Sequence, residues 1–92
     1  MFQYVTEFVG TFIFLSVILA TGQALPIAVA LAAVIYFGGA ISGGHFNPAV
    51  TTMMYFKKNI SSTNAVAYIV AQVLGGLAAL WFYNQTQKSG SN

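Results

Sequence analysis

One short stretch of the sequence combines residue types that could orient a small polar molecule. Ser42-Gly43-Gly44-His45-Phe46 is too rich in glycine for a stable helix, and Asn47-Pro48-Ala49 follows it directly. Asparagine is a favoured N-cap residue, and proline suits the first position of a helix because its missing N–H would be unpaired there anyway. The sequence therefore predicts a loop that leads into a helix starting at Asn47.

A helix that starts inside the protein offers two features to a solute. The free N–H groups of its first turn and the positive end of its dipole attract lone pairs and repel cations. If the side-chain oxygen of Asn47 caps the helix, the amide nitrogen remains as a donor for one water or hydroxyl. Carbonyl groups from Gly43 to Phe46 would add acceptors beside it. This arrangement predicts a path for neutral, hydrogen-bonding solutes that excludes hydronium ions.

No residues for catalysis or metal binding accompany this stretch. The chain has one histidine, one acidic residue and no cysteine, so it lacks paired carboxylates, thiolate ligands and a Ser/His/Asp set. Three lysines are too few to form a basic surface for nucleic acid. We therefore expect a protein that is not an enzyme, that holds no metal or cofactor, and that has no nucleic-acid partner.

The composition indicates which elements position this stretch. Hydrophobic residues make up 58% of the 92 residues and charged residues only 4%, which is typical of a chain that lies in lipid. Three apolar runs, at about 2–20, 24–41 and 64–83, approach the 20 residues that a helix needs to cross a bilayer. The first run has no basic segment ahead of it and contains Glu7, so we interpret it as a retained helix rather than a signal peptide.

The segment at about 42–56 is apolar but too short to cross a bilayer, and Lys57-Lys58 follows it. A re-entrant loop and half-helix is the natural interpretation. The predicted fold is thus an all-α integral membrane protein with three transmembrane helices and one half-helix, in a single membrane domain over residues 1–83. We expect the polar tail at 84–92 to be disordered.

Polar and small residues recur at helical spacing on the first and third spans. Glu7 and Gly10 share one face, as do Gln72, Gly75 and Gly76. We predict that these faces point into protein, where glycines let helices approach closely and the polar groups find hydrogen-bond partners. Two alternatives stay open, because Glu7 could lie near the membrane surface and Gln72 could make an ordinary interhelical hydrogen bond.

Three motifs, in order and spacing, resemble the first repeat of the aquaporin (major intrinsic protein) family: Glu7-Phe8-Val9-Gly10-Thr11-Phe12, Ser42-Gly43-Gly44-His45-Phe46-Asn47-Pro48-Ala49-Val50-Thr51 and Ala71-Gln72-Val73-Leu74-Gly75-Gly76. The resemblance implies a passive channel for water or small neutral solutes such as glycerol. It implies a pore lined by Gly43, Gly44, His45, Phe46, Asn47, Pro48, Ala49 and Val50. It also implies that Glu7 and Gln72, together with His45, hydrogen-bond the loop backbone and hold its carbonyls in line.

The match departs from the family where selectivity is set. Val50 stands where the second repeat of family members usually has an arginine, and Ile27 stands where many water-specific members place an aromatic residue. We therefore predict a wider and less selective pore. For His45, a loop residue satisfied by its neighbours and a gating or pH-sensing residue remain alternatives.

Family members carry two inverted repeats, and this sequence resembles one. A polar loop facing lipid would cost several kcal/mol for each unsatisfied group, so we expect a complement. The simplest is a second, upside-down copy in an antiparallel homodimer, and four such dimers would mimic the tetramer of the family. Lys57 and Lys58 on one side against Lys88 on the other give only a weak orientation bias. A complementary half-channel chain, or a non-conducting role as an assembly element, are the alternatives.

Overall fold

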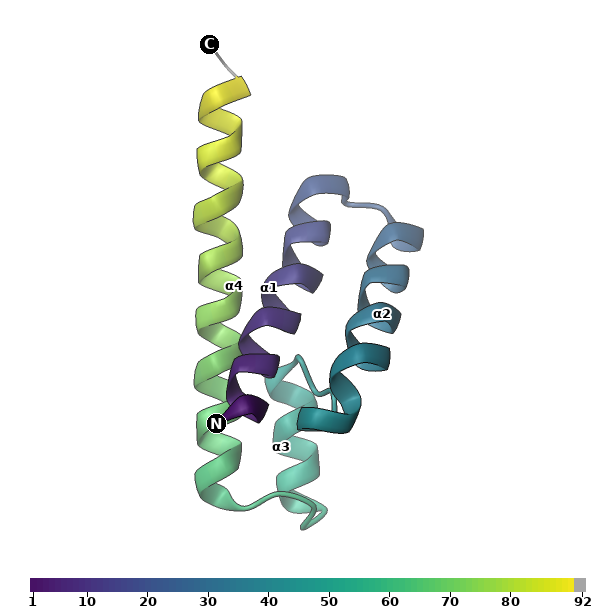
Figure 1. Cartoon of the computed structure of the whole chain (residues 1–92), viewed down its shortest axis with the longest axis vertical. Coiled ribbons are helices and arrows are strands. Elements are labelled where there is room, and N and C mark those ends of the chain that lie inside the picture. The colour runs from purple at the N-terminus through teal and green to yellow at the C-terminus, as the bar shows by residue number, and fades with distance from the viewer. Residues whose placement is uncertain (91–92) are drawn as a thin grey trace.

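A computed structural model describes the backbone of residues 1–90 and the side chains of residues 1–88. These residues form four helices and no strand: α1 (Phe2–Thr21), α2 (Ala24–Ser42), α3 (Pro48–Phe56) and α4 (Ser62–Gly90). Figure 1 shows α1 between α2 and α4, with the short α3 at one end of the bundle, beside α4. The all-α architecture predicted from the sequence is confirmed.

Three of the helices are long and apolar enough to cross a membrane. They cover Phe2–Thr21, Ala24–Ser42 and Ser62–Lys88. The nine residues of α3 span only about 14 Å at 1.5 Å per residue, less than half of the hydrocarbon thickness. The described chain therefore has three spanning helices and one half-helix, as expected of an integral membrane protein.

The connection between α1 and α2 is only two residues long. Gly22 adopts the left-handed conformation with φ 59° and donates its N–H to the Ile18 carbonyl at 2.9 Å, which closes α1. Gln23 is extended, and Pro26 then falls in the first turn of α2, where a missing N–H costs nothing. The two helices are consequently antiparallel neighbours (Figure 1).

The packing of α1 on α4 depends on a glycine. A Cβ atom added at Gly75 would lie 2.7 Å from the Phe8 carbonyl oxygen and 3.2 Å from the Phe12 nitrogen, so the backbones of the two helices nearly touch there. Such close approach adds dispersion contacts where lipid supplies no hydrophobic drive for association.

Helix α4 is longer at both ends than the predicted 64–83. It begins at Ser62, because the Ser61 hydroxyl accepts a hydrogen bond from the Asn64 N–H at 3.1 Å and caps the first turn. It continues to Gly90, so the disordered tail expected at 84–92 is wrong for residues 84–90, whereas residues 91 and 92 lie outside the described part. Residues 84–89 contain no proline or glycine, and extending an existing helix is cheap once its first turns have formed.

Candidate functional site

The loop between α2 and α3 turns back into the protein through three residues with positive φ. Gly43 and Gly44 have φ values of 93° and 69°, and Phe46 has 54°. Phe46 has a side chain, so this conformation costs about 1–2 kcal/mol. Its ring is only 2% exposed, and the burial of an aromatic ring outweighs that cost.

Two glycines on different helices make room for the Phe46 ring. A Cβ atom at Gly10 would lie 2.1 Å from a ring carbon, and one at Gly38 would lie 3.1 Å from another. The role of Gly10 is therefore to admit the loop, not to bring two helices together. Because its ring is held between α1 and α2, Phe46 could contribute its backbone groups, and not its ring, to the lining of a pore.

The buried carboxylate of Glu7, on α1, holds the loop by accepting hydrogen bonds. Its Oε1 accepts hydrogen bonds from the Phe46 N–H at 2.8 Å and the Gln72 side-chain amide at 2.8 Å. Its Oε2 accepts from the Ser42 hydroxyl at 2.7 Å and the His45 N–H at 3.1 Å. Glu7 is 0% exposed, so its side chain is enclosed by protein, and its depth in the membrane stays a prediction. Four neutral donors thus replace water around the buried carboxylate.

Gln72 supports the loop indirectly. Its Nε2 donates to Glu7 Oε1 and to the Thr51 hydroxyl at 2.9 Å, whereas the resemblance implied a bond to the loop backbone. Both N–H groups of the Gln72 amide therefore donate to side chains, and those side chains in turn hold the loop and α3. Gln72 joins α1, α3 and α4 at one point.

Thr51 is a site residue that the sequence did not single out. It is 0% exposed, and its hydroxyl lies 2.8 Å from His45 Nδ1 as well as 2.9 Å from Gln72 Nε2. The one available signal was its spacing, because Thr51 lies one helical turn after Asn47. The hydroxyl ties the short helix to the loop and to α4.

His45 is half-buried and held on two sides. Thr51 binds its Nδ1, and its ring lies edge to face with the Tyr68 ring at a centroid distance of 5.1 Å. Tyr68 in turn donates its hydroxyl to the Ser42 carbonyl at 2.6 Å. These contacts describe a loop histidine satisfied by its neighbours, and a gating role stays a prediction.

The start of α3 is exposed, in contrast to the buried side of the loop and of α3, which Glu7, Gln72 and Thr51 hold. This buried side is called the underside. Asn47 is extended, with φ −161° and ψ 124°, and its Oδ1 accepts the Ala49 N–H at 2.7 Å. Its carbonyl accepts the Thr51 N–H, the first hydrogen bond of the helix. Because Oδ1 is used as the cap, Nδ2 remains as a donor without a partner among the described residues. Asn47, Pro48 and Ala49 are all exposed and Val50 is half-buried.

A groove of about 430 Å³ runs beside this tip, between α1 and α4. Its lining includes Pro48, Thr11 and Gln72, and Gly76 faces Leu15 across it. Thr11 Oγ1 and Gln72 Oε1 are buried without a hydrogen-bond partner among the described residues. Both atoms have almost no accessible surface, so they lie behind the wall of the groove and are not open to it.

Ile27 is not brought to the loop by this chain. It is half-buried in the first turn of α2, fifteen residues before Ser42, and therefore about 22 Å from the loop along the helix axis. A role in a selectivity filter would need the pore to extend to that end of the bundle.

The chain resembles proteins of one family. The family model described as "Major intrinsic protein" matches residues 19–92. Glycerol uptake facilitator protein-like 6 of Lactiplantibacillus plantarum is 44% identical over 86 residues, which cover 84% of this chain and 40% of that protein. Probable aquaporin PIP2-7 of Oryza sativa subsp. japonica is 34% identical over 80% of this chain and 32% of its own length. Aquaporin Z of Photorhabdus laumondii is 40% identical over 63% of this chain. The match thus spans about 40% or less of these relatives.

Proposed function

Because this chain belongs to the major intrinsic protein family, whose members are membrane channels and not enzymes, we propose that it supplies half of a passive pore for water or small neutral solutes such as glycerol. The observation that carries the proposal is the state of Asn47. Its oxygen caps α3 at 2.7 Å, and its Nδ2 stands free at the exposed tip. A donor fixed in this way can hold one water or hydroxyl in a set orientation.

The chemistry of the tip favours neutral solutes over ions. The positive end of the α3 dipole lies at Asn47, and the Glu7 charge is surrounded by four donors on the far side of the loop. A cation that approached the tip would meet the dipole without a free carboxylate to compensate. A water molecule or polyol would instead exchange its hydrogen bonds for the Asn47 amide and the loop carbonyls.

We propose that the complement of this half is a second copy of the chain, inserted upside down. The exposed tip, with the uncapped Asn47 Nδ2 and its first-turn N–H groups, would cost several kcal/mol for each unsatisfied group if it faced acyl chains. An inverted copy would place its own short helix against the same groove and bring the two tips together by a twofold axis. A complementary half-channel chain is the competing partner.

The proposed homodimer would have an unusual constriction. Val50, the residue after Ala49, would occur in both halves, so the pore would hold no fixed arginine there. Glycerol and other small polyols should then pass as well as water, because no permanent cation narrows or charges the passage. Strict selectivity for water would contradict this part of the proposal.

The test is flux through vesicles that contain only the purified 92-residue chain. Water permeability is measured by light scattering after an osmotic step, and glycerol permeability by the recovery of volume. Asn47→Asp keeps an oxygen for the cap but replaces the donor by a carboxylate. The matched control is Asn84→Asp, since Asn84 is an exposed residue near the far end of α4. Flux that equals that of empty vesicles would favour the assembly role.

A second measurement tests the partner. A cysteine introduced at the exposed Lys57 is labelled by a reagent that cannot cross the membrane, applied from one side and then from both. Antiparallel copies predict that about half of the chains react from each side. If all chains react from one side only, the homodimer is excluded and a complementary chain becomes the better explanation.

A further inference from the structure

The turn that follows α3 holds a lysine in a costly conformation. The Lys57 N–H donates to the Met53 carbonyl at 2.9 Å, and the Asn59 N–H donates to the Met54 carbonyl at 2.9 Å, which closes the helix. Between them Lys58 has φ 69°. Glycine is the usual residue at this position, and a residue with a side chain costs about 1–2 kcal/mol there. Backbone strain of this kind clusters at functional sites.

Lys58 is one of the residues that line an open pocket of about 570 Å³ at the α3–α4 turn. The lining also includes Asn59, Ser61 and Ser62, which carry a carboxamide and two hydroxyl groups. The Ser61 oxygen accepts the Asn64 N–H at 3.1 Å, so its own proton is still available for donation. Lys57 is also exposed but is not part of the lining. The pocket is thus rich in donors and holds one cation.

No acidic side chain of the chain is available as a counter-ion for this cation. Glu7 is the only acidic side chain, it is 0% exposed, and its oxygens are filled by four donors. No Asp or Glu can therefore approach Lys58 from within the same chain. An ammonium group among hydroxyls, with no carboxylate in reach, complements an anion from outside.

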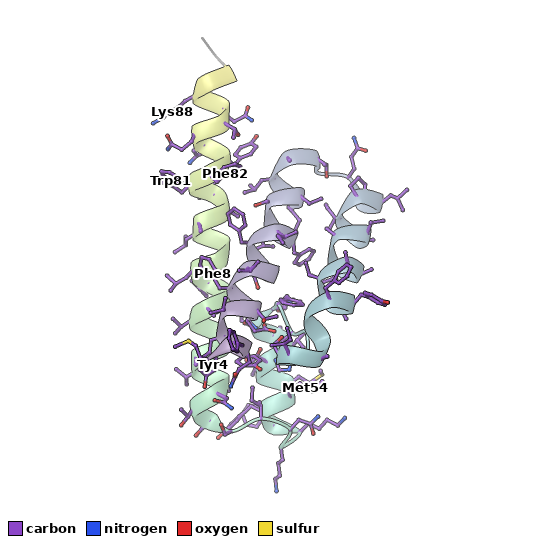
Figure 2. The ribbon with its side chains drawn as sticks, viewed as in Figure 1. Tyr4, Phe8, Met54, Trp81, Phe82 and Lys88 are labelled. Atoms are coloured by element: carbon purple, nitrogen blue, oxygen red, sulfur yellow. The ribbon has the colours of Figure 1, made fainter. Side chains whose placement is uncertain are left out.

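The position of the pocket in the fold indicates which kind of anion lies near it. Figure 1 shows the α3–α4 turn at the opposite end of the bundle from the α1–α2 turn, beyond the end of α2. Tyr55 and Phe56 also line the pocket and are 40% and 75% exposed. Aromatic side chains at the end of membrane helices lie at the depth of the lipid headgroups. In Figure 2 Lys88 lies near the far end of α4, so the two lysine positions face different leaflets.

We propose that the pocket at the α3–α4 turn binds the phosphate of an anionic lipid headgroup, with Lys58 as its cation and the Asn59, Ser61 and Ser62 side chains as hydrogen-bond donors. This site is separate from the tip of α3 and does not depend on conduction. Tyr55 and Phe56 pack against the upper part of the acyl chains. Bound lipid would hold the end of α3 against the start of α4.

The test compares two neighbouring lysines of equal charge. The full chain is purified in a neutral detergent and titrated with short-chain phosphatidylglycerol or phosphatidylcholine, and the melting temperature is followed by circular dichroism. A general attraction of basic residues for anionic lipid predicts the same loss for Lys57→Gln and Lys58→Gln. A pocket whose lining includes Lys58 but not Lys57 predicts a loss for Lys58→Gln only.

We expect phosphatidylglycerol to raise the melting temperature of the wild-type chain more than phosphatidylcholine does. Lys58→Gln should weaken the apparent affinity about fivefold or more, from the loss of one lysine near a phosphate. Lys58→Arg should retain binding, and Lys57→Gln and Lys88→Gln should bind like the wild type. Equal losses for Lys57→Gln and Lys58→Gln, or equal effects of the two lipids, would overturn the site. Inorganic phosphate that displaced phosphatidylglycerol would instead identify a free anion as the ligand and overturn the lipid assignment.

Discussion

The underside of the re-entrant loop and the tip of α3 lie only a few residues apart but have opposite character. On the underside Glu7, Gln72 and Thr51 are almost fully buried and joined by hydrogen bonds. At the tip Asn47, Pro48 and Ala49 are exposed, and the Asn47 amide has a free donor. The difference separates two tasks, because the buried network fixes the backbone while the exposed donor stays available to a solute or a partner.

The largest effect should come from the carboxylate at the centre of the underside. In Glu7→Gln one oxygen becomes an NH₂ group. At the Oε1 position it would face two donors, the Phe46 N–H and the Gln72 amide. At the Oε2 position it would face the His45 N–H, whereas the Ser42 hydroxyl can turn and accept from it. We expect the variant to lose about 3–5 kcal/mol of stability, since each hydrogen bond to a charged group contributes about 1.5–3 kcal/mol. Thermal unfolding in detergent, followed by circular dichroism, measures it. An unchanged melting curve would mean that the loop does not depend on Glu7.

A somewhat smaller loss is expected where the two helices that carry the network touch. Gly75→Ala puts a methyl group 2.7 Å from the Phe8 carbonyl oxygen, and backbone atoms cannot move aside as a flexible side chain can. We expect a loss of about 1–3 kcal/mol from this overpacking. Gly39→Ala is the matched control, because an added Cβ there meets nothing within 4 Å. If both variants have the same melting temperature, the close approach of α1 and α4 at Gly75 does not contribute to stability.

The hydroxyl of Thr51 should matter about as much as one buried hydrogen-bond pair. Thr51→Val keeps the shape of the side chain but leaves one N–H of Gln72 and the Nδ1 of His45 without their partner. We expect a loss of about 1–3 kcal/mol, measured by the same melting assay. Thr51→Ser restores the hydroxyl and should recover most of the loss, whereas a failure to recover would assign the effect to packing of the methyl group.

The sequence could predict the tip better than the underside, and the reason is physical. The start of α3 is local, because Asn47 and Pro48 are adjacent and determine a cap and a first turn without help from the rest of the chain. The inward direction of Glu7 and Gln72 followed from helical spacing. Their shared contact with Thr51 did not follow, since it depends on how α3 lies against α4, and no local pattern specifies that angle.

The role of Phe46 shows the same limit. Its ring lies between Gly10 on α1 and Gly38 on α2, and the three residues are distant in sequence. Gly10 could be recognised as a place of close approach, but which group approaches it depends on the path of the loop. The continuation of α4 to Gly90 departs from the prediction for a different reason. Residues 84 to 89 are polar, which is typical of disorder, but none of them breaks a helix.

The smallest change in stability, and the sharpest test of the contrast, is expected at the tip. Asn47→Asp retains an oxygen that can accept the Ala49 N–H, and a negative charge at a helix start is favourable, so the melting temperature should stay within the equivalent of about 0.5 kcal/mol. Asn47→Ala, which removes the cap, should cost about 1 kcal/mol.

Flux should follow another order, because both variants lose the free donor, and Asp adds a charge that attracts cations to the path. We therefore expect Asn47→Asp to fold like the wild type and to conduct water about tenfold less, which corresponds to about 1.4 kcal/mol for one lost orienting hydrogen bond. If Asn47→Asp instead lost stability in proportion to flux, the tip would belong to the folding network, and the division between the two regions would fail.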